Sequence, residues 1–330
     1  MKYTAVAGGA GFIGSHLCER LLKEGQHVTC IDSLVSGRME NVSRLSEIYP
    51  DRFHIHHIDI NTIDPQLFGS GTGAWFKLPR LDYLYNLACP ASPRAYQRDP
   101  IHTFKTNVLG TINLLEYTRD NGIRFLLTST SEVYGDPLQH PQQECYRGNV
   151  NFIGPRACYD VGKRAAECVI LDYAREYSVS HALNVRIARI FNTFGPNMAM
   201  DDGRVVSNFI VQALKGEDIT VYGDGMQTRS LCYVDDTVNG LIKLMENDGF
   251  QGPVNLGNTT ELTVLELAQI IIRLTESNSK IIYGPLPADD PTRRRPDISL
   301  AEKKLGWLPQ VSLENGLLLT IEHFQHLLFK

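Results

Sequence analysis

The sequence predicts an α/β protein with a doubly wound parallel sheet and a smaller C-terminal lobe, and two observations carry this prediction. Over the first 190 residues, short apolar strand patterns alternate with longer amphipathic stretches, the order expected of β-α-β units. Beyond residue 190 this alternation gives way to shorter segments rich in Gly, Asp and Arg. We therefore expect a sheet domain at 1–190 and a lobe at 191–330, some segments of which return to the main sheet.

Composition narrows the class of protein. The chain has 330 residues, of which 43% are hydrophobic and 21% charged, as in ordinary globular enzymes. Its formal charge of −5 argues against a general nucleic-acid binder. Seven scattered cysteines without a Cys-x-x-Cys pair indicate a reducing compartment, and no apolar run approaches a membrane span. We expect a cytoplasmic protein with no nucleic-acid partner, no membrane partner and no metal.

The first strand pattern, residues 3–7, leads directly into a glycine-rich turn, Gly8-Gly-Ala-Gly-Phe-Ile-Gly14. A strand, such a turn and a helix start place backbone N–H groups and the positive helix end against a pyrophosphate. A second strand pattern, 27–31, ends in Asp32, whose carboxylate can accept both hydroxyls of an adenine ribose. Because an acid there repels a ribose phosphate, the pattern predicts a Rossmann-type site for NAD rather than NADP.

Further strand patterns lie at 53–58, 81–87, 124–129 and 181–188. Ligands of such sheets bind beyond the carboxyl ends of the strands. Two of these ends carry polar segments, Leu87-Ala-Cys-Pro-Ala-Ser-Pro93 and Thr128-Ser-Thr-Ser-Glu-Val-Tyr-Gly135. The stretch 61–80 holds a second glycine cluster but has no leading strand and no following amphipathic helix. We interpret it as a flexible surface insertion.

The most specific catalytic feature is Tyr159-Asp-Val-Gly-Lys163. Residues four apart on a helix project from one face. A phenol titrates near ~10 and is a poor base at neutral pH, but an adjacent ammonium favours the phenolate. The pair can therefore remove a proton from a hydroxyl group. This spacing also occurs by chance on surface helices, and it is the combination with the glycine turn and Asp32 that favours a catalytic role.

These residues together resemble the extended short-chain dehydrogenase/reductase superfamily and, within it, the UDP-glucuronic acid decarboxylases. The segments that carry the resemblance span most of the chain and lie at 87–93, 105–111, 130–136, 148–151, 153–160, 188–196, 202–210, 220–225 and 295–298. The sequence departs from the family pattern at Arg147, where Trp is usual, at Phe152, where Pro is usual, and at Val161, where Glu is usual. These departures leave the fit of the substrate open.

The resemblance implies NAD-dependent decarboxylation of UDP-glucuronic acid to UDP-xylose. NAD takes a hydride from sugar carbon 4 while Tyr159 removes the hydroxyl proton, and the resulting β-keto acid loses carbon dioxide. Protonation at carbon 5 and return of the hydride then leave the cofactor unchanged. The alternatives are release of the UDP-4-keto-pentose with NADH, a UDP-sugar 4-epimerase and a nucleotide-sugar 4,6-dehydratase. In the dehydratases an Asp occupies position 131, where this chain has Ser131, and 4-epimerases usually lack an acid at Glu132.

The resemblance also implies the members of the site. The catalytic residues would be Tyr159, Lys163, Glu132, Ser131, Thr130 and Arg294. Thr130, Ser131 and Tyr159 are expected to bind the oxygen at carbon 4, and Glu132 to orient the ring or a water. The cofactor-binding residues would be Gly8, Gly11, Phe12, Ile13, Gly14, Asp32, Asp59, Ile60, Leu87, Ala88, Thr128, Tyr159 and Lys163.

The C-terminal lobe is expected to bind the UDP-sugar. The substrate-binding residues implied by the resemblance are Ala91, Tyr96, Lys105, Asn192, Asn208, Tyr222, Arg229 and Arg294. A guanidinium suits a diphosphate because its forked donors bind two oxygens at once. The resemblance further implies a homodimer, in which the Tyr-Lys helix and the helix after Pro100 of two subunits form a four-helix bundle.

Overall fold

A computed structural model describes residues 1–64, 80–177, 183–286 and 293–329 of the chain. The strands of its main sheet are β1 (Tyr3–Ala7), β2 (His27–Asp32), β3 (Phe53–His57), β4 (Tyr83–Asn86), β5 (Arg124–Thr130), β6 (Val185–Ile190) and β11 (Val254–Leu256). Within the described residues they pair in parallel in the order β11-β6-β5-β4-β1-β2-β3. The strand order reverses between β1 and β4, which confirms the doubly wound α/β fold.

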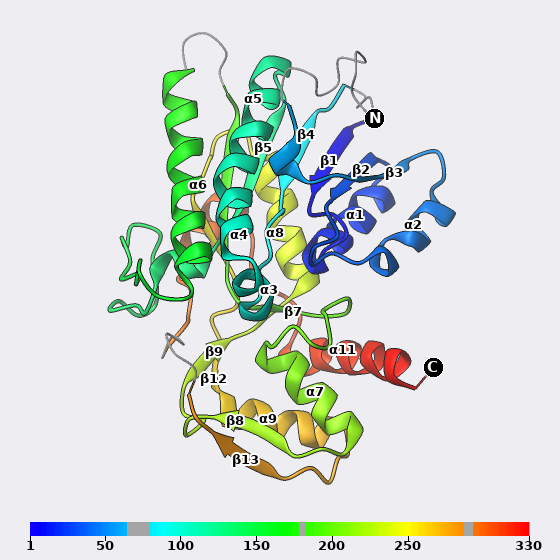
Figure 1. Cartoon of the computed structure of the whole chain (residues 1–330), viewed down its shortest axis with the longest axis vertical. Helices are drawn as coiled ribbons and strands as arrows, with labels where there is room; N and C mark the ends of the chain where they lie inside the picture. The colour runs from blue at the N-terminus through cyan, green and yellow to red at the C-terminus, as the bar shows by residue number, and fades with distance from the viewer. Residues whose placement is uncertain (65–79, 178–182, 287–292, 330) are drawn as a thin grey trace.

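Helices cover both faces of this sheet (Figure 1). One face carries α1 (Phe12–Lys23), α2 (Ser43–Ile48) and α8 (Val234–Glu246). The other carries α4 (Pro100–Lys105), the π-helical segment η3 (Thr106–Gly110), α5 (Thr111–Asn121) and α6 (Ala157–Glu176). Successive side chains of a strand point to opposite faces of the sheet, so each strand contributes to both layers. In β1, Val6 packs on the first face, whereas Ala5 and Ala7 pack on the second.

Each of the two helices that border the site, α1 and α6, buries the side chains along one of its faces. In α1 the apolar side chains of Leu17, Cys18, Leu21 and Leu22 are fully buried. α6 likewise buries residues at positions 159, 163, 166, 167 and 170, so its buried face includes Tyr159 and Lys163 as well as apolar side chains. Packing on the sheet thus turns both predicted catalytic residues toward the strand ends.

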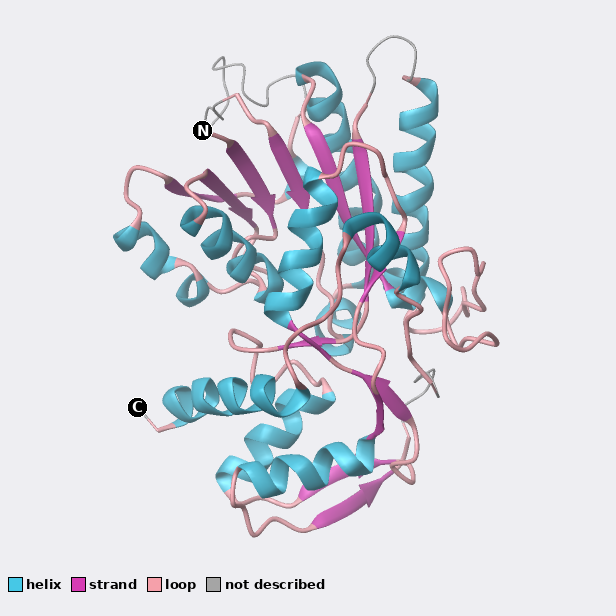
Figure 2. Ribbon diagram, turned by 180° about the vertical axis from the view of Figure 1, so that it is seen from behind, coloured by secondary structure: helices cyan, strands magenta, loops and turns pink. Residues whose placement is uncertain are grey.

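The C-terminal lobe lies below the main sheet in Figure 1 and is seen from behind in Figure 2. It contains β7 (Thr193–Phe194), α7 (Val205–Lys215), β8 (Ile219–Tyr222), β9 (Thr228–Ser230), β10 (Cys232–Tyr233), β12 (Glu261–Thr263), α9 (Val264–Leu274), β13 (Ile281–Gly284) and α11 (Leu313–Leu328). β7 pairs with β10 and β8 with β13 in parallel, and β9 pairs with β12 antiparallel. A capping box between Thr263 and Glu266 begins α9.

Some later segments belong to the sheet rather than to the lobe. β11 extends the main sheet beside β6, and α8 packs against α1 and against β5 and β6. The helix α10 (Ser299–Leu305) packs on β11 and α8. The remaining short helices are η1 (Met39–Asn41), η2 (Ile60–Thr62), α3 (Pro93–Arg98) and η4 (Ser131–Tyr134). The division of the chain between residues 190 and 191 stays a prediction.

The strand patterns at 53–58, 81–87 and 124–129 correspond to β3, β4 and β5. The pattern at 181–188 corresponds to β6, which begins at Val185, and residues 178–182 lie outside the described residues. Most of the predicted surface insertion, residues 65–79, also lies outside them. Among the helices that the structure describes, none has the length and apolar character needed to cross a membrane.

Candidate active site

A cleft of about 1370 Å³ lies at the carboxyl ends of the main-sheet strands, with the C-terminal lobe forming its other wall. It brings together most of the sequence-predicted residues: Gly8, Gly11, Phe12, Ile13, Gly14, Leu87, Ala91, Tyr96, Thr128, Thr130, Ser131, Glu132, Tyr159, Lys163, Asn192, Asn208, Tyr222, Arg229 and Arg294. A smaller cavity of about 60 Å³ shares part of this lining and adds Asp32, Asp59, Ile60 and Ala88. Lys105 lines neither space, because it is an exposed residue at the end of α4.

The glycine turn between β1 and α1 forms a close backbone cradle. Gly8 has φ +80°, and a Cβ there would lie 2.6 Å from the carbonyl carbon of Leu87. A Cβ at Gly14 would overlap the carbonyl oxygen of Gly8. Without these side chains, the first backbone N–H groups of α1 face the cleft at the positive end of the helix. The turn therefore suits a pyrophosphate.

Asp32 is buried at the end of β2 and is held by backbone donors. Its Oδ2 accepts from the N–H of Ala10 at 2.9 Å, and its Oδ1 from the N–H of Leu34 at 2.8 Å. Burial raises the pKa of Asp32, and these N–H groups oppose the shift only in part. The carboxylate has lone pairs left for two further donors, as the hydroxyls of a ribose require.

The predicted base pair lies deep in the cleft. Lys163 donates from Nζ to the carbonyl oxygen of Thr128 at 3.0 Å, and its Nζ lies 6.0 Å from the centre of the Tyr159 ring. Burial raises the pKa of the Tyr159 phenol and lowers that of the Lys163 ammonium. In this structure burial thus works against the phenolate that we expected Lys163 to stabilise.

Tyr96 of α3 packs against Tyr159. The rings of Tyr96 and Tyr159 are stacked, with centroids 5.0 Å apart and planes 5° from parallel. Both side chains are almost fully buried. The contact fixes the plane of the Tyr159 ring, so Tyr96 lies beside the predicted base as well as on the cleft wall.

Glu132 of η4 lies between two guanidinium groups. Its Oε2 accepts from Arg294 at 2.9 Å and from Arg156 at 3.0 Å, and Arg294 also donates to the carbonyl oxygen of Ser131. Burial alone would raise the pKa of Glu132, but Arg294, Arg156 and Arg229 together lower it. The carboxylate is therefore ionised at neutral pH and lies among cations within the cleft.

The structure distinguishes the three neighbouring arginines at 293–295. Arg294 is only 1% exposed, whereas Arg293 is exposed and Arg295 is intermediate. Arg156, which the sequence reasoning missed, also lines the cleft. Its signal was available, because Arg156 lies three residues before Tyr159 within the segment 153–160 that carries the family resemblance.

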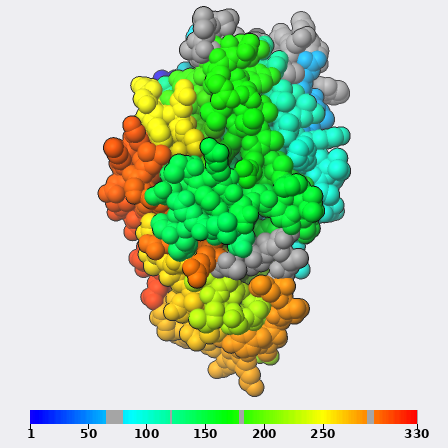
Figure 3. Space-filling model, turned by 90° about the vertical axis from the view of Figure 1, so that its left-hand side faces the viewer, coloured from blue at the N-terminus to red at the C-terminus, as the bar shows by residue number. Residues whose placement is uncertain are grey.

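The positions that depart from the family pattern lie away from the cleft lining. Arg147 and Phe152 belong to the segment between η4 and α6, which covers much of the surface seen in Figure 3. Phe152 is 77% exposed. Val161 lies on α6 but is not among the residues that line the cleft. We therefore expect these three departures to act on the substrate only indirectly.

Comparison with known proteins identifies the class first. A sequence model of the NAD dependent epimerase/dehydratase family matches residues 4–257. The solved structure of UDP-glucose 4-epimerase from Thermotoga maritima, with UDP-glucose, has a TM-score of 0.87 and 31% identity and covers 99% of each chain. This chain belongs to this family and has its fold.

Closer relatives specify the branch. UDP-glucuronic acid decarboxylase 4 of Arabidopsis thaliana is 50% identical over 324 residues, which are 98% of this chain and 69% of the relative. UDP-glucuronic acid decarboxylase 1 of Danio rerio is 50% identical over 323 residues, or 98% and 72% of the two chains. This chain belongs to the UDP-glucuronic acid decarboxylase family.

Proposed function

We propose that this protein converts UDP-glucuronic acid to UDP-xylose and carbon dioxide, using NAD that is reduced and reoxidised within one turnover. Relatives that are named for this substrate match nearly the whole chain. The observation that carries the proposal is the meeting of Tyr159, Glu132 and Arg294 on one cleft that also contains the glycine cradle. A base, a paired carboxylate and a buried guanidinium would therefore border the sugar of a bound nucleotide.

The residues present fit a dinucleotide. The cradle at Gly8 and Gly14 leaves room that a Cβ would fill, and Asp32 offers acceptors for ribose hydroxyls. Lys163 would bind the nicotinamide ribose in addition to the carbonyl of Thr128. Bound here, NAD would supply a positive ring beside the buried phenol and a reversible acceptor for the hydride of sugar carbon 4.

Tyr159 is the proposed base for the hydroxyl on carbon 4. Thr130, at the end of β5, and Ser131, the first residue of η4, line the same cleft and would hold the carbon 4 oxygen with Tyr159. Loss of carbon dioxide from the 4-keto acid leaves an enolate, and these hydroxyl donors stabilise its charge. Tyr159 then returns a proton to the oxygen when carbon 4 is reduced.

We propose that Glu132 and Arg294 act at carbon 5 of the sugar and at the carboxylate attached to it. The guanidinium of Arg294 is fixed by Glu132 and by the Ser131 carbonyl, so its direction is set before substrate binds. Glu132 would orient the sugar ring or a water during reprotonation. A Ser at position 131 lacks the acid that a dehydratase needs there, which favours decarboxylation over dehydration.

The lobe would bind the nucleotide diphosphate. Arg229 of β9 and Tyr222 of β8 line the cleft from the lobe, together with Asn192 and with Asn208 of α7. Arg229 offers a forked donor for two phosphate oxygens. The sequence-predicted role of Lys105 gains no support from its exposed position outside the cleft.

We also propose a homodimer in the reducing cytoplasm. On the helix formed by α4 and η3, Ile101 is 66% exposed, Phe104 40% and Leu109 42%. An apolar helix face of this kind supports packing against a second copy in a four-helix bundle with α6. The free cysteines of the chain support a reducing compartment. Light scattering of the wild type and of Ile101→Glu tests the dimer, which should become a monomer in the variant.

The proposed reaction is tested with purified protein, UDP-glucuronic acid and a catalytic amount of NAD. Mass spectrometry should show loss of one carbon dioxide from the sugar nucleotide, and absorbance at the NADH wavelength should show no net reduction. Release of the 4-keto pentose would instead give one NADH for each carbon dioxide. An unchanged nucleotide mass would reject decarboxylation and favour epimerisation.

A further inference from the structure

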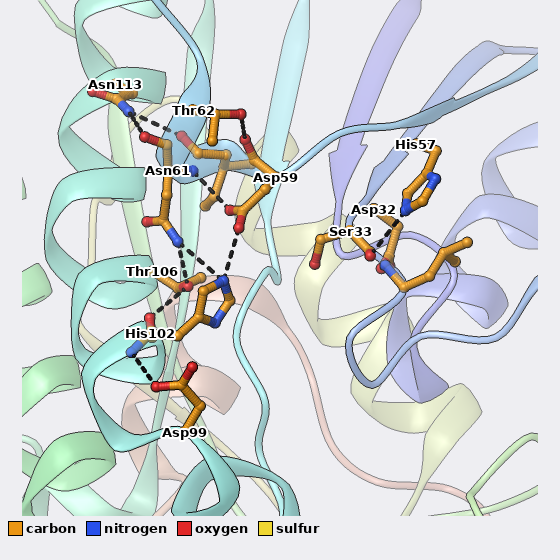
Figure 4. Close-up of polar contacts among 12 residues, drawn as sticks. Asp32, Ser33, His57, Asp59, Asn61, Thr62, Asp99, His102, Thr106 and Asn113 are labelled. Carbon is orange, nitrogen blue, oxygen red and sulfur yellow. Dashed lines mark hydrogen bonds and ion pairs between the residues drawn. The ribbon is translucent and has the colours of Figure 1, made fainter.

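Two hydrogen-bonded clusters lie next to the site without taking part in the proposed chemistry. In the first, Oδ2 of Asp59 lies 2.7 Å from Nε2 of His102 (Figure 4), and both residues line the small cavity beside the glycine cradle. The second surrounds Gln142, which is fully buried and does not line the cleft. Because Gln142 is bonded to the residue after Arg294, this second cluster can act on the cleft through that arginine.

Arg294 lies on a segment with little regular structure of its own. In the described part of the chain, residues 293–298 precede α10 and form no helix. The Arg294 side chain donates to the carbonyl oxygen of Ser131 and, at 2.9 Å, to Oε2 of Glu132. A guanidinium has five N–H donors, so donors remain for a ligand. Their direction depends on how the backbone at Arg294 is held.

Gln142 holds the backbone next to Arg294. Its side-chain Oε1 accepts from the N–H of Arg295 at 2.9 Å, and its backbone N–H donates to the Arg295 carbonyl at 2.9 Å. Its Nε2 donates to the Gln139 carbonyl at 2.8 Å, which leaves the amide oxygen for Arg295. The N–H of Arg295 belongs to the planar peptide unit that joins it to Arg294. The Gln142 amide therefore sets the orientation of the backbone from which the Arg294 side chain projects.

Asn255 of β11 attaches this arrangement to the main sheet. Its Nδ2 donates to the carbonyl oxygens of Gln142 at 3.0 Å and of Asp297 at 3.1 Å. Its Oδ1 accepts from the hydroxyl of Tyr134 at 2.7 Å, and Tyr134 ends the short helix η4 that carries Glu132. The side chains of Gln142, Asn255 and Tyr134 are all fully buried. Arg294 and its partner Glu132 are thus aligned with one another by a buried frame.

The frame bears on one part of the substrate more than on the rest. Without the Gln142 oxygen, the N–H of Arg295 loses its acceptor, and the segment has to shift to restore one. A displacement of about 1 Å is enough to misalign a group that acts on a ligand. Arg229 and Tyr222, which line the cleft from the lobe, lie on β9 and β8 and are not bonded to Gln142. A shift at Arg294 should therefore affect the sugar carboxylate and spare the nucleotide.

We propose that Gln142 is a positioning residue for recognition of the sugar carboxylate, and that it acts by aiming Arg294. The inference rests on the proposed role of Arg294 at that carboxylate. Gln142 itself would touch neither substrate nor cofactor, because it does not line either cavity. Its removal should therefore lower selectivity for an acidic sugar while leaving affinity for the nucleotide part unchanged.

The test compares UDP-glucuronic acid with UDP-glucose, which has a hydroxymethyl group in place of the carboxylate. Both are titrated calorimetrically into NAD-saturated protein that carries Tyr159→Phe, so that the bound sugar is consumed slowly. This parent protein should bind UDP-glucuronic acid at least tenfold more tightly than UDP-glucose. Adding Gln142→Met, which keeps the volume and removes the acceptor, should reduce the preference to less than about threefold. Gln142→Glu keeps the acceptor but loses the donor to Gln139, and it should give an intermediate preference.

Gln212→Met is the matched control. Gln212 of α7 also accepts from a backbone N–H, that of Thr220 at 3.2 Å, but Thr220 lines the cleft from the lobe. This variant should change both affinities by the same factor and leave their ratio unchanged. Arg294→Ala should remove most of the preference, and adding Gln142→Met to it should remove no more, because the glutamine acts through the arginine. Circular dichroism and NAD binding report whether each variant is folded.

Two outcomes would overturn the inference. Full preference for UDP-glucuronic acid in Gln142→Met would show that Arg294 does not depend on the glutamine. Affinities for both ligands that fall together in Gln142→Met would leave Gln142 with a structural role only. A parent protein that does not bind UDP-glucuronic acid would refute the proposed function as well, whereas decarboxylation by the wild type with an unchanged preference in Gln142→Met would refute the inference alone.

Discussion

The cleft and the small cavity beside it each hold a buried carboxylate, in opposite electrostatic environments. At the sugar end, Glu132 is surrounded by Arg294, Arg156 and Arg229, and its pKa is lowered despite burial. At the cofactor end, Asp32 is held by the backbone N–H groups of Ala10 and Leu34, and burial raises its pKa. Full positive charges therefore outweigh desolvation in one place, and backbone dipoles do not outweigh it in the other.

The difference follows from what each end would bind. Ribose hydroxyls are neutral donors, and a carboxylate with free lone pairs serves them without any cation nearby. The sugar end would receive a carboxylate and develop negative charge during decarboxylation, which requires guanidinium groups. Holding a cofactor and performing the reaction thus demand different electrostatics in two neighbouring cavities that share part of their lining.

The largest expected effect is at the base. Tyr159→Phe should lower turnover by about a factor of 10³, within the range expected for a general base, because the ring and its stacking on Tyr96 remain while the proton acceptor is lost. Rapid mixing followed by NADH absorbance measures oxidation of the sugar directly. Tyr96→Phe is the matched control and should keep most activity. Normal oxidation by the Tyr159 variant would remove it as the base.

Glu132→Gln tests the charged sugar end. Arg294 and Arg156 would lose their shared anion, so we expect a loss of about 3 kcal/mol in the free energy of unfolding at neutral pH, together with slower steps after substrate binding. Because the pKa of Glu132 lies below its ordinary value of 4.5, this contribution is complete above pH 4.5. It should disappear as the pH falls through the lowered pKa.

Denaturant unfolding of the wild type and of Glu132→Gln at several pH values measures this difference. The gap between the two proteins should be constant above pH 4.5 and should narrow below it. A gap that widens on acidification would contradict the assigned environment. An unchanged decarboxylation rate in the variant would leave Glu132 with a structural role only.

Asp32→Asn tests the cofactor end and should have a smaller effect. An amide offers fewer acceptor sites than a carboxylate, so NAD should bind about tenfold or more weakly, with little change in UDP binding. Because the pKa of Asp32 is raised above 3.8, wild-type affinity for NAD should fall on acidification already above that pH. Calorimetry at several pH values should show this fall in affinity for the wild type. An affinity that does not change with pH in Asp32→Asn would show that the fall comes from protonation of Asp32.

The smallest effect is expected outside both ends. Lys105→Ala removes an exposed side chain that lines neither cavity, and KM for UDP-glucuronic acid should change by less than about twofold. Arg229→Ala, within the cleft, is the comparison and should raise KM far more. A tenfold rise in KM for Lys105→Ala would mean that α4 reaches the sugar in the loaded enzyme, as the family resemblance implied.

Much of the site could be anticipated because its signals are local. The glycine turn needs only a strand, three glycines and a helix start in succession, and Tyr159 and Lys163 share a face because they are four apart on one helix. Arg156 lies in a segment that resembles the family, but its pairing with Glu132 joins two separate parts of the chain, and residue spacing did not reveal it. Lys105 lies within a segment that resembles the family, yet the packing of α4 leaves its side chain in solvent.

The sequence by itself determined the doubly wound sheet through the order of its strand and helix patterns, and it determined the dinucleotide cradle and the identity of the proposed base through spacing within short segments. Only the tertiary structure decided which of three successive arginines is buried, which carboxylate lies among cations, and that His102 reaches Asp59. These are contacts between segments far apart in the chain. Their energies depend on burial and on distance in space, which residue spacing does not record.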